Sequence, residues 1–117
     1  MRVLERLRQK KKIIVVFQPH RYSRIRSLKS EFASCFKNSD QVILCPVYAA
    51  GEAVDKGYSK EKFAQLITKF SKTQVILIEN EILLSKYLSK NLISDELVIG
   101  MGAGSISKWM YNLKNIL

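Results

Sequence analysis

The chain has 117 residues, of which 47% are hydrophobic and 26% charged, so its composition indicates one folded domain and excludes a disordered or fibrous protein. The two cysteines, Cys35 and Cys45, lie in apolar segments without CxxC spacing, which argues against a disulfide scaffold or a zinc site and favours a reducing compartment. No apolar run approaches the roughly 18 residues of a membrane span, and the first residues do not resemble a signal peptide, so we expect a cytoplasmic protein.

The net charge of +10 is concentrated near the start of the chain. Residues 1–29 hold ten basic residues and one acidic residue, whereas residues 30–117 hold ten basic and nine acidic residues. A local basic excess indicates an anionic ligand, an acidic partner surface or a solvated face. We interpret the lysines at 10–12 as solvated. By contrast, Arg21, Arg24 and Arg26 cluster beside the only histidine, and their guanidinium groups suit bidentate binding of carboxylate or phosphate.

Apolar periodicity predicts helices that alternate with four short apolar strands. Ser59 and Asn80 are predicted to cap the helices that follow them. Strands that are apolar on both faces predict an α/β fold in which a parallel sheet lies between two helix layers. In chain order the predicted elements are a helix at 2–9, a strand at 12–17, a helix at 25–37, a strand at 42–47, a helix at 60–70, a strand at 75–78, a helix after Asn80, a strand at 97–101 and a helix from Ile106 to Leu113.

Ligands of such folds bind beyond the carboxyl ends of the strands, so the loops at 18–24, 48–57 and 102–105 are the candidate site. In the first loop Pro19 ends the strand, and an imidazole, two guanidiniums and two hydroxyls follow beside the start of a helix. Free amides at a helix N-terminus favour anions, so this loop suggests an anion site. The alternative is a solvated basic turn in which the histidine bonds a carbonyl. The five side chains are His20, Arg21, Tyr22, Ser23 and Arg24.

The second loop begins with Tyr48 and contains small residues and Gly51, which allow the backbone to approach a neighbour or ligand closely. Glu52 could bind an ammonium group, pair with an arginine of the first loop or form a surface ion pair. In the third loop, Gly102 and Gly104 match part of a dinucleotide-binding motif, but the motif follows the last strand instead of the first. We interpret these glycines as permitting a tight strand-to-helix turn with Ser105 as a potential N-cap.

Several chemistries have no candidate residues in this sequence. It contains no Gly-x-x-x-x-Gly-Lys-Ser/Thr motif for nucleotide phosphates, and it has one histidine and no clustered carboxylates. We therefore expect no metal site and no complete catalytic set within this chain.

Taken together, the three loops resemble the C-terminal domain of the Mur ligases, and the resemblance covers nearly the whole chain. The matching segments are residues 17–24, 47–53 and 102–106, and the Gln-Pro-His-Arg of the first is typical of the branch that adds L-alanine. The resemblance implies a Rossmann-like last domain of a three-domain enzyme, whose N-terminal and central domains are absent from this sequence. Ser105 and Ser107 stand where the family usually has an Asn or Asp and a Gly.

The resemblance also implies a reaction. The whole enzyme would use ATP and Mg²⁺, held mainly by the central domain, to join L-alanine to UDP-N-acetylmuramate through an acyl phosphate in peptidoglycan biosynthesis. His20, Arg21 and Arg24 would face the substrate, with the arginines on the alanine carboxylate. This chain alone is expected to be inactive, with no cofactor of its own. The residues expected to line the cleft are Tyr22, Ser23, Tyr48, Gly51 and Glu52.

One alternative of a different class is a free-standing basic α/β module that binds RNA or docks an acidic partner. The charge of residues 1–29 favours it, but aromatic residues are not interleaved with that charge as they are in stacking platforms for nucleic acids, so we do not expect a nucleic-acid partner.

Overall fold

The computed structural model describes residues 12–92, 96–102 and 105–116. Of residues 105 and 113–116 only the backbone is described. The predicted helix at 2–9 lies outside the described residues. The predicted alternation of strands and helices is otherwise confirmed, with boundaries that differ by a few residues. The elements are β1 (Ile13–Gln18), α2 (Tyr22–Ser34), β2 (Gln41–Leu44), α3 (Lys60–Ser71), β3 (Gln74–Leu77), α4 (Glu81–Asn91), β4 (Leu97–Gly102) and α5 (Ser105–Ile116).

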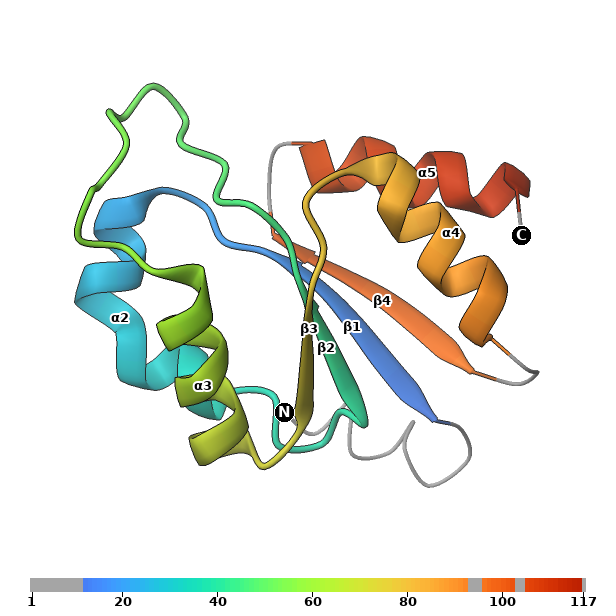
Figure 1. Cartoon of the computed structure of the whole chain (residues 1–117), viewed down its shortest axis with the longest axis horizontal. Coiled ribbons are helices and arrows are strands. Elements are labelled where there is room, and N and C mark those ends of the chain that lie inside the picture. Colours follow the sequence, from blue (N-terminus) through green and yellow to red (C-terminus); the bar gives the residue numbers. More distant parts are fainter. Residues whose placement is uncertain (1–11, 93–95, 103–104, 117) are drawn as a thin grey trace.

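The four described strands form one parallel sheet in the order β3-β2-β1-β4 (Figure 1). β1 is central and pairs with β2 on one side and with β4 on the other. All residues of β1 and β2 are buried, as their apolar sequences predict for strands covered on both faces. The register brings the carboxyl ends of β1, β2 and β4 to the same edge of the sheet.

Two helix layers cover the sheet, with α2 and α3 on one face and α4 and α5 on the other (Figure 1). Alternate residues of β1 point to opposite faces, so Val15 and Phe17 join the core under α2 and α3, whereas Ile14 and Val16 join the core under α4 and α5. The ring of Phe17 packs against the ring of Phe36 with centroids 5.1 Å apart. This is the predicted three-layer α/β fold.

The helix ends follow local capping chemistry. The side chain of Ser59 accepts a hydrogen bond from Lys62 N, and that of Asn80 accepts one from Leu83 N, so both predicted caps are confirmed. None of the helices in the described ranges is long and apolar enough to cross a bilayer.

Two large apolar residues within the predicted helices at 25–37 and 60–70 are not buried. Leu28 is 36% exposed because the backbone of α2 departs from helical geometry at this residue (φ −120°, ψ 26°), and Ile25 and Ala33 are buried instead. Phe70 is 47% exposed near the end of α3. The side chain of Leu113 lies outside the described residues.

Candidate functional site

The loops after β1 and β2 stay paired beyond the ends of their strands. His20 and Tyr48 form an isolated parallel bridge, and their rings stack with centroids 5.7 Å apart and an interplanar angle of 15°. The N–H of Arg21 donates to the carbonyl oxygen of Tyr48, and the N–H of Tyr48 donates to that of Pro19, both at 2.8 Å. The structure therefore brings together the first and second predicted loops.

A tight turn delivers Glu52 to this junction. The N–H of Glu52 donates to the carbonyl oxygen of Ala49 at 3.1 Å, and the two central residues have positive φ, 52° at Ala50 and 91° at Gly51. Two positive φ angles are typical of a type I′ turn, which favours glycine. A Cβ on Gly51 would meet nothing within 4 Å, so the glycine is needed for its backbone conformation and not for the close approach that the sequence suggested.

The carboxylate of Glu52 lies at the N-terminus of α2. One of its oxygens accepts the N–H of Ser23 at 3.2 Å, and the other accepts the Ser23 hydroxyl at 2.5 Å. The hydroxyl hydrogen bond is the largest cause that lowers the pKa of Glu52, and the amides of Ser23 and Tyr22 and the charge of Arg21 lower it further. The sequence left the partner of Glu52 open, and the structure shows that this partner is the first turn of α2.

The arginines of this region have different environments. Arg26 forms an ion pair with Asp55 at 2.7 Å, whereas Arg21 and Arg24 are exposed and make no ion pair within the described parts of the chain. Arg24 and His20 border a cavity of about 280 Å³ whose lining is mainly apolar. Its remaining lining residues are Phe17, Gln18, Phe32, Cys35, Phe36, Met101 and Gly102. The guanidinium groups of Arg21 and Arg24 are therefore available to bind an anion at the sheet edge.

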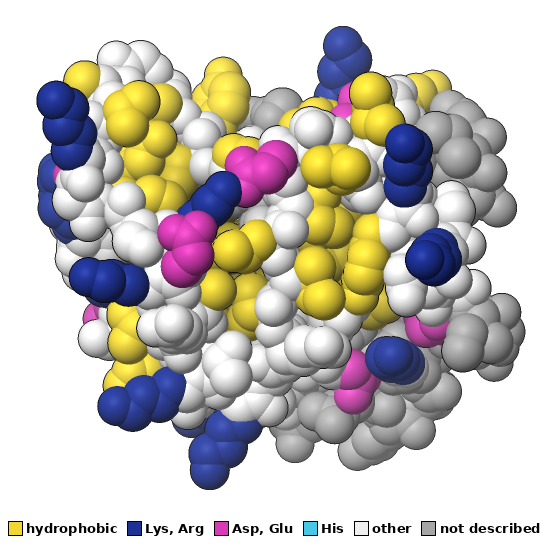
Figure 2. Space-filling view, in the orientation of Figure 1, with side chains coloured by type: hydrophobic (Ala, Val, Ile, Leu, Met, Phe, Trp, Pro, Cys, Tyr) yellow, Lys and Arg dark blue, Asp and Glu magenta, His cyan; other side chains and the backbone are white. Residues whose placement is uncertain are grey.

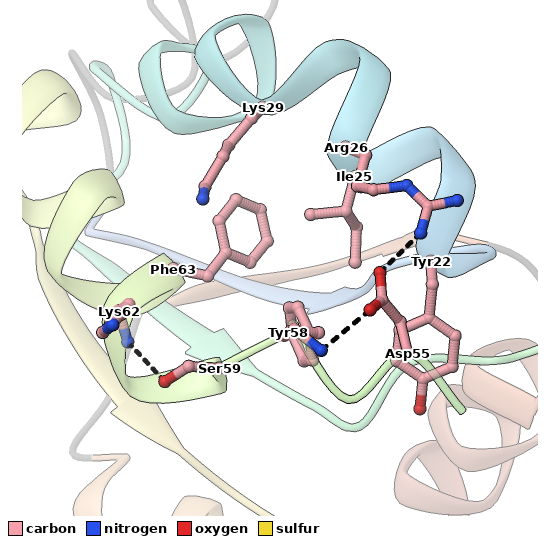
Figure 3. A pocket seen from close by; sticks show the side chains of 10 residues that line it. Tyr22, Ile25, Arg26, Lys29, Asp55, Tyr58, Ser59, Lys62 and Phe63 are labelled. Carbon is pink, nitrogen blue, oxygen red and sulfur yellow. Dashed lines mark hydrogen bonds and ion pairs between the residues drawn. The ribbon is translucent and has the colours of Figure 1, made fainter.

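A second cavity, of about 300 Å³, lies between α2 and α3 (Figure 3). At this cavity, the side chain of Arg26 extends from α2 toward the carboxylate of Asp55. Tyr22 lines this second cavity and packs edge-on against Tyr58, with ring centroids 5.6 Å apart. The structure thus places the Tyr22 side chain apart from the cavity that Arg24 and His20 border. Burial raises the pKa of Tyr58, whose hydroxyl has no hydrogen-bond partner among the described residues.

Gln18 links the end of β1 to the segments that follow β2 and β4, although we did not predict a role for it from the sequence. Its side chain is buried, its Nε2 donates to the carbonyl oxygen of Pro46 at 3.1 Å, and its Oε1 accepts the N–H of Ile106 at 2.9 Å. The side chain therefore links the end of β1 to the loop after β2 and to the first turn of α5. The signal in the sequence is a polar residue that ends an otherwise apolar strand directly before proline.

The third loop requires glycine where it meets β1. Gly102 pairs with Gln18 in the sheet and has a φ of 129°, and a Cβ there would lie 2.2 Å from the carbonyl oxygen of Gln18. The predicted strand-to-helix turn stays a prediction, because Gly102 is the last residue of β4 and residues 103–104 lie outside the described residues. Gly104 lies outside the described residues, and Ser105 begins α5 with a side chain that is not described, so its capping role stays a prediction.

The described residues contain no group of three His, Cys, Asp or Glu side chains that could hold a metal ion, and the sequence has no phosphate-binding loop motif. What the arrangement offers is cationic side chains at the edge of a parallel sheet, where ligands of this fold class bind.

Comparison with known proteins identifies relatives over most of the chain. No family model matches it. It is 43% identical over 105 residues to the UDP-N-acetylmuramate–L-alanine ligase of Pelagibacter ubique. The matched segment covers 90% of this chain and 23% of that protein. Proteins with the same name from Caulobacter sp. strain K31 and Rhodospirillum rubrum are 38% and 41% identical over 87% and 85% of the chain, or 22% and 21% of their own lengths.

These relatives confirm the resemblance noted in the sequence. The chain spans less than a quarter of the length of the curated relatives it matches. They give no support to the alternative of a free-standing RNA-binding module. On the face shown in Figure 2, the described lysine and arginine side chains are also scattered singly and do not form one basic patch.

Proposed function

Because the chain is homologous to one segment of the UDP-N-acetylmuramate–L-alanine ligases, we propose that it is the C-terminal domain of such a ligase and presents L-alanine to the rest of the enzyme. One observation carries this proposal. Arg21 and Arg24 lie without ion-pair partners in the described structure, at the sheet edge where the loops after β1 and β2 are joined.

In the proposed reaction, the guanidinium groups of Arg21 and Arg24 bind the α-carboxylate of L-alanine. This binding orients the amine toward the activated carboxyl group of UDP-N-acetylmuramate, which enters as an acyl phosphate made with ATP and Mg²⁺ on the domains outside this chain. The amine nitrogen forms the amide bond to the carbonyl carbon, the bond to the phosphate oxygen breaks, and the amine loses a proton. The contribution of this chain is orientation and charge, which raise the effective concentration of the amine.

The same proposal covers the remaining expectations for the site. His20 lines the same cavity as Arg24 and stacks on Tyr48, so both rings would border the bound amino acid. Ser23 and Glu52 would act through α2 and not through direct contact with substrate. The enzyme would act in the cytoplasm, where its nucleotide substrates are made, and this chain alone would not catalyse ligation.

Steady-state kinetics of the full-length ligase that contains this chain would test the proposal. Arg24→Ala should raise KM for L-alanine about 10- to 100-fold, because a hydrogen bond to a charged group contributes about 1.5–3 kcal/mol and about 1.4 kcal/mol corresponds to tenfold in binding. KM for ATP should stay within a factor of about two. Arg26→Ala is the matched control, since Arg26 lies on the same helix and pairs with Asp55. An unchanged KM for L-alanine in Arg24→Ala would remove Arg24 from the carboxylate site.

A further inference from the structure

The N-terminus of α2 is held by a carboxylate from another loop. The first amides of a helix have no intrahelical acceptor and need a partner. The N-cap residue of α2 is Arg21, whose side chain makes no capping hydrogen bond and whose φ is 69°. The carboxylate of Glu52, from the loop after β2, instead accepts the N–H and the hydroxyl of Ser23.

We propose that Glu52 is a positioning residue for the two arginines that flank Ser23. By fixing the first turn of α2, its carboxylate holds Arg21 before that turn and Arg24 within it in the orientation that binds the carboxylate of the amino-acid substrate. This inference rests on the proposed function, and it gives Glu52 an indirect role in binding the substrate.

The backbone around this contact supports a positioning role. Arg21 has a φ of 69° and Ala50 a φ of 52°, although neither residue is a glycine. Such conformations are strained for residues that carry a Cβ, and they persist where surrounding contacts determine them. Here those contacts are the pairing of Arg21 with Tyr48 and the two hydrogen bonds that Ser23 donates to the carboxylate of Glu52. The two strained residues therefore lie on either side of the same junction.

The charges support the same role. Arg21 and Arg24 repel each other and the positive end of the α2 dipole, and a carboxylate at this position offsets that repulsion. The carboxylate also occupies the Ser23 amide, which could otherwise bind a free anion. The guanidinium groups of Arg21 and Arg24 are exposed and make no ion pair within the described structure, so they can bind an incoming carboxylate at this loop.

Kinetics of the full-length ligase would separate this role from direct binding and from a general loss of structure. Glu52→Gln should raise KM for L-alanine by about 3- to 10-fold, and KM for ATP should not change. If Glu52 acts through Arg24, the double variant Glu52→Gln/Arg24→Ala should have the same KM for L-alanine as Arg24→Ala alone. Asp55→Asn is the matched acid-to-amide control in the same loop. Its partners are the guanidinium group of Arg26 on α2, whose side chain is 66% exposed, and the N–H of Gly57 in its own loop. Neither partner is an arginine proposed to bind the substrate, so Asp55→Asn should leave KM for L-alanine unchanged.

Hydrogen exchange of the 117-residue chain, measured by NMR, tests the positioning role without relying on the proposed function. Glu52→Gln should speed the exchange of the Ser23 amide several-fold and leave the amides in the middle of β1 unchanged. Unchanged exchange at Ser23 would overturn the inference whatever the kinetics show. A KM for L-alanine that changes equally in Glu52→Gln and Asp55→Asn, or effects of Glu52→Gln and Arg24→Ala that simply multiply, would also overturn it. If Arg24→Ala itself leaves that KM unchanged, the proposed function fails and the exchange result still decides whether Glu52 orders the turn.

Discussion

Replacing Gln18 by methionine should destabilise the chain by about 2–4 kcal/mol. Methionine has a similar length and volume but cannot accept the N–H of Ile106 or donate to the carbonyl oxygen of Pro46, which the Gln18 side chain does at 2.9 and 3.1 Å. A buried backbone group left without a partner costs about 1–3 kcal/mol. The cost is largest at Ile106, which is 2% exposed, and smaller at the partly buried Pro46. A typical domain has about 5–15 kcal/mol of stability, so the variant should still fold.

Gln41→Met is the matched control for this prediction. Gln41 is also a buried strand glutamine, but its amide donates to the side chains of Gln74 and Tyr87, which can turn toward water when the partner is lost. We expect a loss of about 0.5–1.5 kcal/mol for this variant.

The assay for both variants is urea unfolding of the 117-residue chain followed by circular dichroism. With a slope of about 1.5 kcal/mol per molar urea, the midpoint of Gln18→Met should lie about 1.3–2.7 M below that of the unsubstituted chain. It should also lie below the midpoint of Gln41→Met. Equal midpoints for the two variants would refute the reasoning that Gln18 stabilises the chain through backbone groups with no access to water.

Three further predictions concern other parts of the fold. Gly102→Ala should lower the free energy of unfolding by about 3 kcal/mol or more, because its Cβ would lie 2.2 Å from a backbone oxygen. Gly51→Ala should lower it by about 1 kcal/mol, from its φ of 91° alone. Urea midpoints compare the two variants, and equal losses would contradict the argument. Burial raises the pKa of Cys35 to about 11 and of Cys45 to about 12, so both thiols should react slowly with a disulfide reagent at pH 8 until urea unfolds the chain. Hydrogen bonds lower the pKa of Glu52 below its ordinary value of 4.5, so its stabilising contribution is complete above that value and is lost as the pH falls through the lowered pKa. The loss of stability on acidification should therefore be smaller in Glu52→Gln, and identical acid unfolding curves would contradict this.

Much of the fold could be predicted from the sequence because its signals are local. Apolar runs specify buried strands, and Ser59 and Asn80 cap their helices through hydrogen bonds three residues away. α2 begins at Tyr22, before the predicted start at 25. The carboxylate that accepts the Ser23 amide at this start belongs to Glu52, 29 residues away in the sequence. A contact at that separation leaves no periodic signal, so the early start could not be predicted.

The sequence indicated where in the fold the candidate site would lie, but not the contacts within it. The loops could be located because parallel strands end at one edge of a sheet. Which side chains face each other there depends on tertiary contacts that span many residues, such as the stacking of His20 on Tyr48 and the link from Gln18 to Ile106. Residue types alone could not show that Tyr22 turns toward Tyr58 between α2 and α3.

The most direct test of the proposed function is a segment exchange. The ligase of Pelagibacter ubique matches this chain over 105 residues, and that segment can be replaced by the corresponding residues of this chain. We expect the chimaera to form product from ATP, UDP-N-acetylmuramate and L-alanine, and to lose this activity at low L-alanine concentrations when it carries Arg24→Ala. A chimaera that folds and binds ATP but forms no product at any L-alanine concentration would contradict the proposal that this chain presents the amino acid.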